Sequence, residues 1–201
     1  MRKNERGIYH AIFILNKPDT TMLGQLTDFS MNKYDLRCYR EGIKQLQENE
    51  VSFLPIEKIP FAKEWCPIYK YDERFVAYAP SDWGNHEKIA LTDSTLVFSR
   101  MDCLYPYAIQ KIETESPKRY RIELKGPYSG EQVQCYIHVV DPAQEIIVFE
   151  TRYSEEQSDF KLMASAAKLK HFPILVNYCT EQKQMEVHFN EPDFRALIGE
   201  K

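Results

Sequence analysis

Glycine is scarce in this sequence, with seven among 201 residues. Too few are available for glycine-rich phosphate-binding loops or for a collagen-like or low-complexity chain. Long apolar runs are missing as well: the run near the N-terminus extends only from Ile8 to Leu15, and His10 interrupts it. Such a run is too short to cross a bilayer, and no small-residue cleavage site follows it. We therefore interpret it as the first β-strand and expect no membrane span.

An excess of basic charge is also lacking. The formal net charge is −4 and the isoelectric point about 5.8. Nucleic-acid-binding domains usually carry a basic stripe, because neutralising phosphates supplies much of their affinity. The most basic segment, residues 118–125, has the pattern of a strand, with Glu123 among the basic side chains of one face. A solvated face is the simpler interpretation, and no nucleic-acid partner is expected.

Paired cysteine spacings are absent too. The five cysteines are widely separated: Cys38, Cys66, Cys103, Cys135 and Cys179. This spacing does not indicate a disulfide framework, although it leaves individual disulfides open. A reducing cytoplasm is the expected compartment. A secreted or envelope-anchored protein is the alternative if a signal or lipid anchor originally preceded this N-terminus.

The remaining composition is that of a globular protein, with 43% hydrophobic and 28% charged residues. No internal repeat, linker or charge block divides the chain, so residues 1–201 are expected to form a single β-rich domain. Helical periodicity is confined to residues 31–50, 159–170 and 191–198. In the first of these segments one apolar stripe is formed by Leu36, Tyr39, Ile43 and Leu46.

Strand patterns fill most of residues 51–153. In the clearest example, alternate residues are expected to face inward (Val133, Cys135, Ile137, Val139) and outward (Gln134, Tyr136, His138). Further strands are expected at 74–79, 87–91, 94–99, 105–113, 118–125, 145–153, 173–180 and 184–189. Strands about ten residues apart indicate an antiparallel meander that forms a barrel or a sandwich. The predicted class is α+β, mainly β, with two or three flanking helices; as an architectural analogy, the pattern is compatible with a lipocalin-like barrel.

The segment SDWGNHEK, residues 81–88, places Ser81, Asp82 and His86 close together. A hydrolase would need a serine whose proton a histidine accepts, with an acid orienting that histidine. Members of such triads normally come from separate loops, and no G-x-S-x-G motif occurs in the chain. The favoured interpretation is a polar turn between two strands. Trp83 then becomes its most informative residue, because a large apolar side chain stands in a polar turn.

Metal binding and thiol chemistry have weaker support. Cys135 and His138 have a suggestive spacing, but on a strand they point to opposite faces. No HExxH or CxxC motif occurs, so no metal and no cofactor are expected. A reactive thiolate at Cys103 would need a nearby base or positive charge. Arg100 is close in sequence, but Asp102 opposes it, and a structural cysteine is favoured.

Aromatic residues are the feature that the chain has in excess, with thirteen Tyr and eleven Phe. They are dense between residues 65 and 107, where antiparallel strands alone would favour some of them. Tyr and Trp also offer rigid contact area with a polar tip. We therefore hypothesise a non-enzymatic binding protein whose surface comprises residues 65–86 and 101–107. Its predicted contact residues are Trp65, Tyr69, Trp83, Tyr105 and Tyr107.

The ligand of that surface is expected to be a protein partner or a small apolar or glycan-like molecule. The rival hypothesis is a hydrolase-like enzyme with His86 as base and Ser81, Asp82 or Cys103 nearby. A third hypothesis is a structural subunit whose exposed aromatic residues form a homo-oligomer interface.

Overall fold

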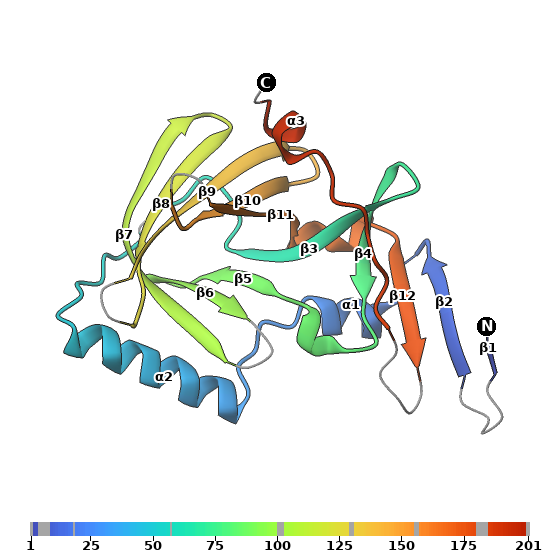
Figure 1. The fold of residues 1–201 in the computed structure, drawn as a ribbon, viewed down its shortest axis with the longest axis horizontal. Helices are drawn as coiled ribbons and strands as arrows, with labels where there is room; N and C mark the ends of the chain where they lie inside the picture. Colours follow the sequence, from blue (N-terminus) through green and yellow to red (C-terminus); the bar gives the residue numbers. More distant parts are fainter. Residues whose placement is uncertain are drawn as a thin grey trace.

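The structure is a computed structural model that describes residues 2–3, 9–17, 19–56, 58–99, 103–128, 131–154, 157–179 and 185–199. Most of its strands form one antiparallel barrel (Figure 1). In spatial order these strands are β3 (Glu64–Tyr71), β11 (Ser158–Ser165), β10 (Ile146–Arg152), β9 (Gln132–Asp141), β8 (Arg119–Lys125), β7 (Leu104–Ser116), β6 (Thr95–Ser99) and β5 (Lys88–Leu91). Pairing of Trp65 on β3 with Ile89 on β5 closes the ring.

The predicted antiparallel meander is confirmed, and it closes as a barrel rather than folding as a sandwich. Strands β5 to β11 are neighbours both in sequence and in space. Short turns make this possible. Between β9 and β10, for example, the Asp141 carboxylate accepts the backbone amides of Ala143 and Gln144 at 2.8 and 3.0 Å. A side chain that bonds its own backbone in this way reverses the chain within a few residues.

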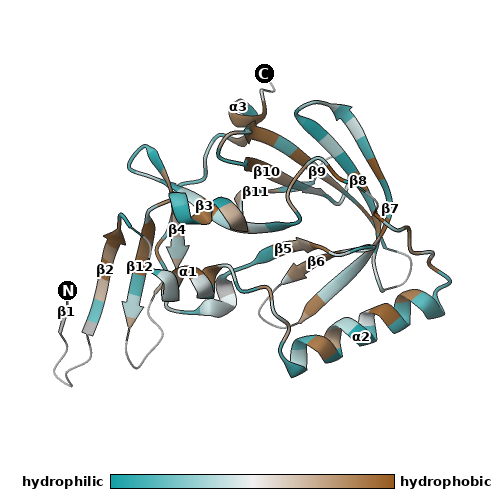
Figure 2. Ribbon diagram, turned by 180° about the vertical axis from the view of Figure 1, so that it is seen from behind, coloured by the Kyte–Doolittle hydropathy of each residue, from teal (hydrophilic) through white to brown (hydrophobic). Residues whose placement is uncertain are grey.

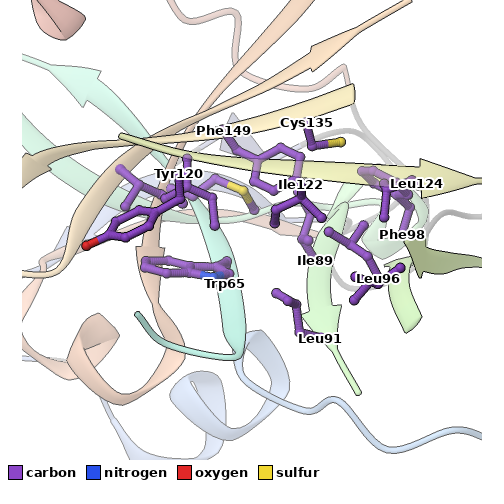
Figure 3. Packing of buried hydrophobic residues seen from close by; sticks show 14 of the residues in the cluster. Trp65, Ile89, Leu91, Leu96, Phe98, Tyr120, Ile122, Leu124, Cys135 and Phe149 are labelled. Atoms are coloured by element: carbon purple, nitrogen blue, oxygen red, sulfur yellow. The ribbon is translucent and has the colours of Figure 1, made fainter. Parts of the chain in front are cut away.

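Large side chains fill the interior of the barrel. Trp65 from β3 lies among residues of the facing strands, including Ile89, Ile122 and Phe149 (Figure 3). The predicted inward residues Val133, Cys135 and Ile137 join this core, and Val139 packs at its margin. Burial of this apolar surface is the main contribution that stabilises the barrel.

A second sheet branches from the barrel at β3. Its order is β1 (Arg2–Lys3), β2 (Tyr9–Leu15), β12 (Ile174–Cys179), β4 (Arg74–Ala79) and β3. The pairing of β12 with β4 is parallel, and the other pairings are antiparallel. Strand β3 therefore belongs to both sheets: residues near Trp65 pair within the barrel, and residues 68–71 pair with β4.

Both faces of the second sheet are covered. Helix α1 (Thr20–Leu26), which sequence patterns did not predict, packs Leu26 against Ala77 and Ala79 of β4. On the other face, Val187 and Phe189 contact Val76 and Tyr78. In Figure 1 this C-terminal segment runs across β4 and β12 before it reaches α3 (Phe194–Ile198). Alternate residues of β4 thus meet different partners.

The helix predicted at 31–50 is confirmed as α2 (Lys33–Glu48). Its N-terminus has a capping box, in which Asn32 accepts the amide of Asp35 and the Asp35 carboxylate accepts the amide of Asn32. Brown and teal residues alternate along α2 in Figure 2, as expected for an amphipathic helix. The helix lies against β7, where Leu46 meets Ala108.

The helix predicted at 159–170 is wrong. Residues 158–165 form β11, and Ala166–His171 form the short 3₁₀ helix η2. The strand has apolar partners on both faces, because Met163 enters the barrel core while Leu162 packs on its outside. Apolar residues on two faces imitate helical periodicity, and the hydrogen-bond ladders with β10 and β3 decide the conformation.

Three further expectations need correction. The described part of 184–189 contains no strand, although Val187 and Phe189 alternate toward the sheet. Helix α3 is shorter than predicted because Asp193 caps it; Gly199 follows in the left-handed conformation with φ of 77°. Tyr136 and His138 do point out of the barrel, but they are buried rather than solvated.

Cysteine spacing also missed a disulfide. Cys38 on α2 is bonded to Cys103, 65 residues later, just before β7. Packing of α2 against β7 brings the two residues together, and their separation in sequence gives no sign of it.

Two glycines give a matched test of how α2 packs. A Cβ at Gly42 would lie 2.7 Å from ring atoms of Pro106, whereas a Cβ at Gly24 on α1 would meet nothing within 4 Å. We expect Gly42→Ala to lower the free energy of unfolding by about 1–2 kcal/mol, because overpacking exceeds the gain in helix propensity. Gly24→Ala should raise it by about 0.5–1 kcal/mol. Urea denaturation measures both, and equal effects would contradict the packing described here.

Candidate functional site

The loop between β4 and β5 carries the residues that the sequence singled out. It contains the 3₁₀ turn η1 (Trp83–Asn85), which Asp82 caps by accepting the amide of Gly84 at 3.1 Å. The Ser81 hydroxyl donates to Glu186 Oε1 at 2.7 Å, and the Asp82 amide donates to the same oxygen at 2.7 Å. A carboxylate from the C-terminal segment therefore fixes the start of this loop.

His86 is turned to a different partner. Its Nε2 lies 3.3 Å from the carbonyl oxygen of Leu26, and its ring meets Trp83 edge-on at 5.8 Å. Burial lowers the pKa of His86 to about 4, so the ring is neutral at pH 7. With the Ser81 proton donated to Glu186 and the His86 ring on a carbonyl, these contacts do not form a serine–histidine nucleophile.

The disulfide leaves Cys103 without a thiol, so the arrangement provides no nucleophile at that position. The buried thiols of Cys66 and Cys135 are unreactive for a different reason. Burial raises the pKa of Cys66 and the pKa of Cys135, each to about 12. Among the described residues no group of three His, Cys, Asp or Glu side chains could hold a metal ion.

The five predicted aromatic contacts do not form one surface. Trp65 is 2% exposed inside the barrel, and Tyr107 packs edge-on against Phe98 at its margin. Tyr69 stacks on Phe189 over the second sheet. Tyr105 lies with Tyr128 beside the disulfide. Residues 101 and 102 of the predicted surface lie outside the described residues. Trp83, which is 39% exposed, lines a cavity larger than the one that Tyr69 lines.

This cavity, here called the Trp83 cavity, has a volume of about 570 Å³. It lies between the chain that links α1 to α2 and the outer side of β5 and β6. Ionisable groups on its wall are Asp28, Asp35, Glu64, His86 and Lys88, and its larger apolar groups are Phe29, Met31, Trp83, Leu91 and Leu104. Ligand cavities typically measure about 300–1,000 Å³ and combine apolar walls with a few polar groups.

Lys88 balances part of the acidic charge of the Trp83 cavity. Its ammonium group donates to the carbonyl oxygen of Asp28 and lies 4.9 Å from the centre of the Phe29 ring. Burial lowers the pKa of Lys88. Hydrogen bonds from Ser30 lower the pKa of Asp28, which keeps that carboxylate ionised. Three carboxylates and one ammonium leave the wall acidic.

A second polar cluster lies on the outer face of the barrel. Glu150, 2% exposed, accepts hydrogen bonds from His138 at 2.9 Å, Arg152 at 2.7 Å and Ser158 at 2.9 Å. Burial raises the pKa of Glu150, but these hydrogen bonds lower it by more, to about 2. All three donors meet one carboxylate, which gives the buried His138 a hydrogen-bond partner.

Sequence reasoning found Trp83 and His86 but missed most of the site. Lys88, Asp28 and Asp35 come from ordinary polar positions on three separate segments. Glu186 follows Ser81 by 105 residues in sequence. No local motif marks it. Glu186 lies beside Ser81 because the second sheet brings β4 next to β12.

Comparison of the chain with protein-family models, curated proteins and solved structures finds no match. Within the described part of the chain, no helix has both the length and the hydropathy to span a membrane.

The buried neutral His86 makes a prediction about pH. Its pKa rises from about 4 in the folded chain to its ordinary value of 6.5 on unfolding, so the unfolded state binds more protons between these values. The stabilising contribution is complete above pH 6.5 and is lost as the pH falls to about 4; 2.5 pKa units correspond to about 3 kcal/mol. His86→Gln should flatten this part of the profile.

Urea denaturation between pH 7 and pH 4 measures the effect. The exposed His171 on η2 provides the control, because His171→Gln should reproduce the wild-type profile. The stabilising contribution of Glu150 is lost as the pH falls from its ordinary pKa of 4.5 to about 2, so it overlaps only the acidic end of this range. A wild-type profile that matches His86→Gln would show that His86 is not buried as described.

Proposed function

We propose that this chain is a non-enzymatic binding protein that holds a small amine-bearing molecule in the Trp83 cavity. The observation that carries the proposal is the partly exposed indole of Trp83, on a loop anchored by Glu186, at the wall of a cavity of about 570 Å³. Anchoring matters because a contact residue that is already ordered loses less conformational entropy when a ligand binds.

The chemistry of the wall selects the ligand class. Asp35 and Glu64 offer carboxylate oxygens, which accept hydrogen bonds from ammonium groups. The face of a tryptophan attracts cations more strongly than the face of a tyrosine or a phenylalanine does. Lys88 over Phe29 already shows the cavity holding an ammonium group against an aromatic ring and a carbonyl oxygen. Sugars also donate hydrogen bonds to carboxylates, through their hydroxyl groups, and they also stack on aromatic rings. They carry no positive charge, however, for the acidic wall to attract.

The hydrolase alternative has less support. Its base, His86, is neutral and close to the Trp83 cavity, as such a mechanism would require. Its nucleophile is the difficulty, since Ser81 donates to Glu186 and Cys103 is disulfide-bonded. A non-enzymatic role needs neither group to be reactive.

A lipocalin-like use of the barrel, with a ligand inside, is supported by one observation. The indole nitrogen of Trp65 is buried and has no hydrogen-bond partner among the described residues. Buried donors are normally satisfied, so a polar group inside the barrel would explain it. Against this stands the packing of the interior by Trp65, Phe149 and their neighbours, which leaves the Trp83 cavity as the preferred site.

Isothermal calorimetry with a panel of primary amines, and with sugars as a second arm, tests the proposal. We expect at least one amine to bind, and Trp83→Ala to weaken its binding at least tenfold, about 1.4 kcal/mol. Tyr153, which is 45% exposed and does not line the cavity, gives the control variant Tyr153→Ala, with unchanged affinity. Binding that is equal in Trp83→Ala, or no amine binding at all, would refute the proposed function.

A further inference from the structure

The segment of residues 185–190 crosses the second sheet without joining it as a strand. Its contacts with the sheet include those of the Glu186 and Phe189 side chains and of the Val187 backbone amide. Met185 at its beginning is 90% exposed. The segment thus lies on the sheet as a separate extended peptide would, through side-chain recognition at defined positions.

Five donor groups surround the Glu186 carboxylate. They are the Tyr78 hydroxyl, the Ser81 amide at 3.3 Å, the Ser81 hydroxyl at 2.7 Å, the Asp82 amide at 2.7 Å and the Asn177 side-chain amide at 3.2 Å. Burial raises the pKa of Glu186, but these hydrogen bonds lower it by more, so the group is a carboxylate at neutral pH. Hydrogen bonds to an ionised acceptor are about twice as strong as neutral ones.

Two of the donor side chains, those of Tyr78 and Asn177, are oriented by the sheet. Asn177 is 2% exposed, and its side-chain oxygen accepts from His10 Nε2 at 2.6 Å, which turns its amide nitrogen toward Glu186. Tyr78 is 5% exposed on β4, where its hydroxyl also accepts the Val187 amide at 3.0 Å. Residues of β4, β12 and the loop after β4 thus form a site for a carboxylate.

An aromatic position accompanies the carboxylate. Phe189 stacks on Tyr69 with ring centres 4.2 Å apart and meets Tyr78 edge-on at 5.1 Å. Such pairs stabilise a contact beyond the apolar area that they bury. The site therefore recognises a glutamate and, three residues later, an aromatic side chain.

We propose that these residues form a peptide-docking groove, here called the Glu186 groove, whose occupant in this structure is the chain's own segment 185–190. A partner protein that presents an extended Glu-x-x-Phe segment replaces it. Charge complementarity supports this occupant, since removal of the carboxylate would leave buried donors unsatisfied, and a second acidic segment satisfies them equally. The groove goes beyond small-molecule binding in the Trp83 cavity and does not depend on it.

A peptide with the sequence of residues 185–192, blocked at both ends and carrying a fluorophore, tests the groove by fluorescence anisotropy. The full-length double variant Glu186→Gln, Phe189→Ala releases the resident segment and should bind this peptide. Wild type should bind it at least tenfold more weakly, because its own segment competes at high effective concentration. A peptide with glutamine in place of its glutamate should also bind at least tenfold more weakly. The proposal would be overturned if the folded double variant did not bind the peptide with the natural sequence, or bound the natural and the glutamine peptide equally.

Hydrogen exchange in the wild-type chain provides a test that does not depend on whether the variant folds. The Val187 amide should exchange through a local opening, faster than the amide of Val176 in the centre of β12. Exchange of Val187 only by global unfolding would overturn the proposal, because a partner could not then replace the segment in the native protein.

Discussion

Alanine in place of Trp65 is expected to lower the free energy of unfolding by about 3–5 kcal/mol. The indole is 2% exposed and lies in the barrel core among Ile89, Ile122 and Phe149. Its removal loses the transfer free energy of a large apolar group and leaves a cavity that the surrounding strands fill only in part. Strand β3 also joins the two sheets, so a loss at Trp65 affects the closure of the barrel directly.

The other tryptophan is the matched control. Trp83→Ala should change the free energy of unfolding by less than about 1 kcal/mol, because its side chain is 39% exposed at the cavity wall. Urea denaturation followed by circular dichroism measures both variants. Similar losses of unfolding free energy at the two positions would mean that Trp83 is a core residue. The Trp83 cavity would then have no exposed indole to contact a ligand.

Removal of the Cys38–Cys103 disulfide is expected to cost about 4 kcal/mol. The bond spans 65 residues, and a loop of that size restricts the unfolded chain by about this amount in the chain-entropy treatment. It also holds α2 against β7, where the apolar contacts around Leu46 and Ala108 are few. The double variant Cys38→Ala, Cys103→Ala should therefore unfold at much lower urea concentration than wild type.

Reduction of the wild-type protein provides the internal control. A dithiol reductant should bring its unfolding midpoint close to that of the double variant and leave the variant itself unchanged. Mass spectrometry after thiol alkylation of the protein unfolded in denaturant should find three modified cysteines without reductant and five after reduction. Five modified cysteines without reductant would show that the bond does not form.

The mainly β architecture could be predicted because alternation reports burial on one face of a strand. It placed Val133, Cys135 and Ile137 inside correctly. It failed for Tyr136 and His138, since the outward face is itself covered where Arg152 lies over the Tyr136 ring and Glu150 binds His138. A periodicity shows which residues share a face, but not whether that face meets water.

The prediction of a helix at residues 159–170 was wrong for a related reason. Phe160, Met163 and Ala167 recur at helical spacing, yet a strand buried on both faces offers apolar residues at nearly any spacing. The opposite error occurred at 184–189, where strand-like alternation belongs to a segment held by side chains alone. In both places the deciding hydrogen bonds come from residues far away in sequence, which local patterns do not contain.

The candidate site could be predicted only at its most conspicuous residue. Trp83 drew attention because it is a large apolar side chain in a polar turn. Asp28, Lys88 and Glu186 are brought to the candidate site and its loop by tertiary packing, which the local sequence does not show. The aromatic density between residues 65 and 107 proved to be distributed over the barrel core, the second sheet and the disulfide region. Aromatic composition indicated the amount of buried ring surface rather than a single binding face.

The most direct test of binding in the Trp83 cavity uses the two tryptophans as reporters. A ¹H–¹⁵N spectrum contains two indole N–H signals, one from Trp65 and one from Trp83, which the Trp83→Ala variant assigns. On titration with the amine panel, the Trp83 signal should shift with saturation while the Trp65 signal stays in place. A shift of Trp65 instead would place the ligand inside the barrel, and a Trp83 signal unchanged by every amine would contradict the proposed function.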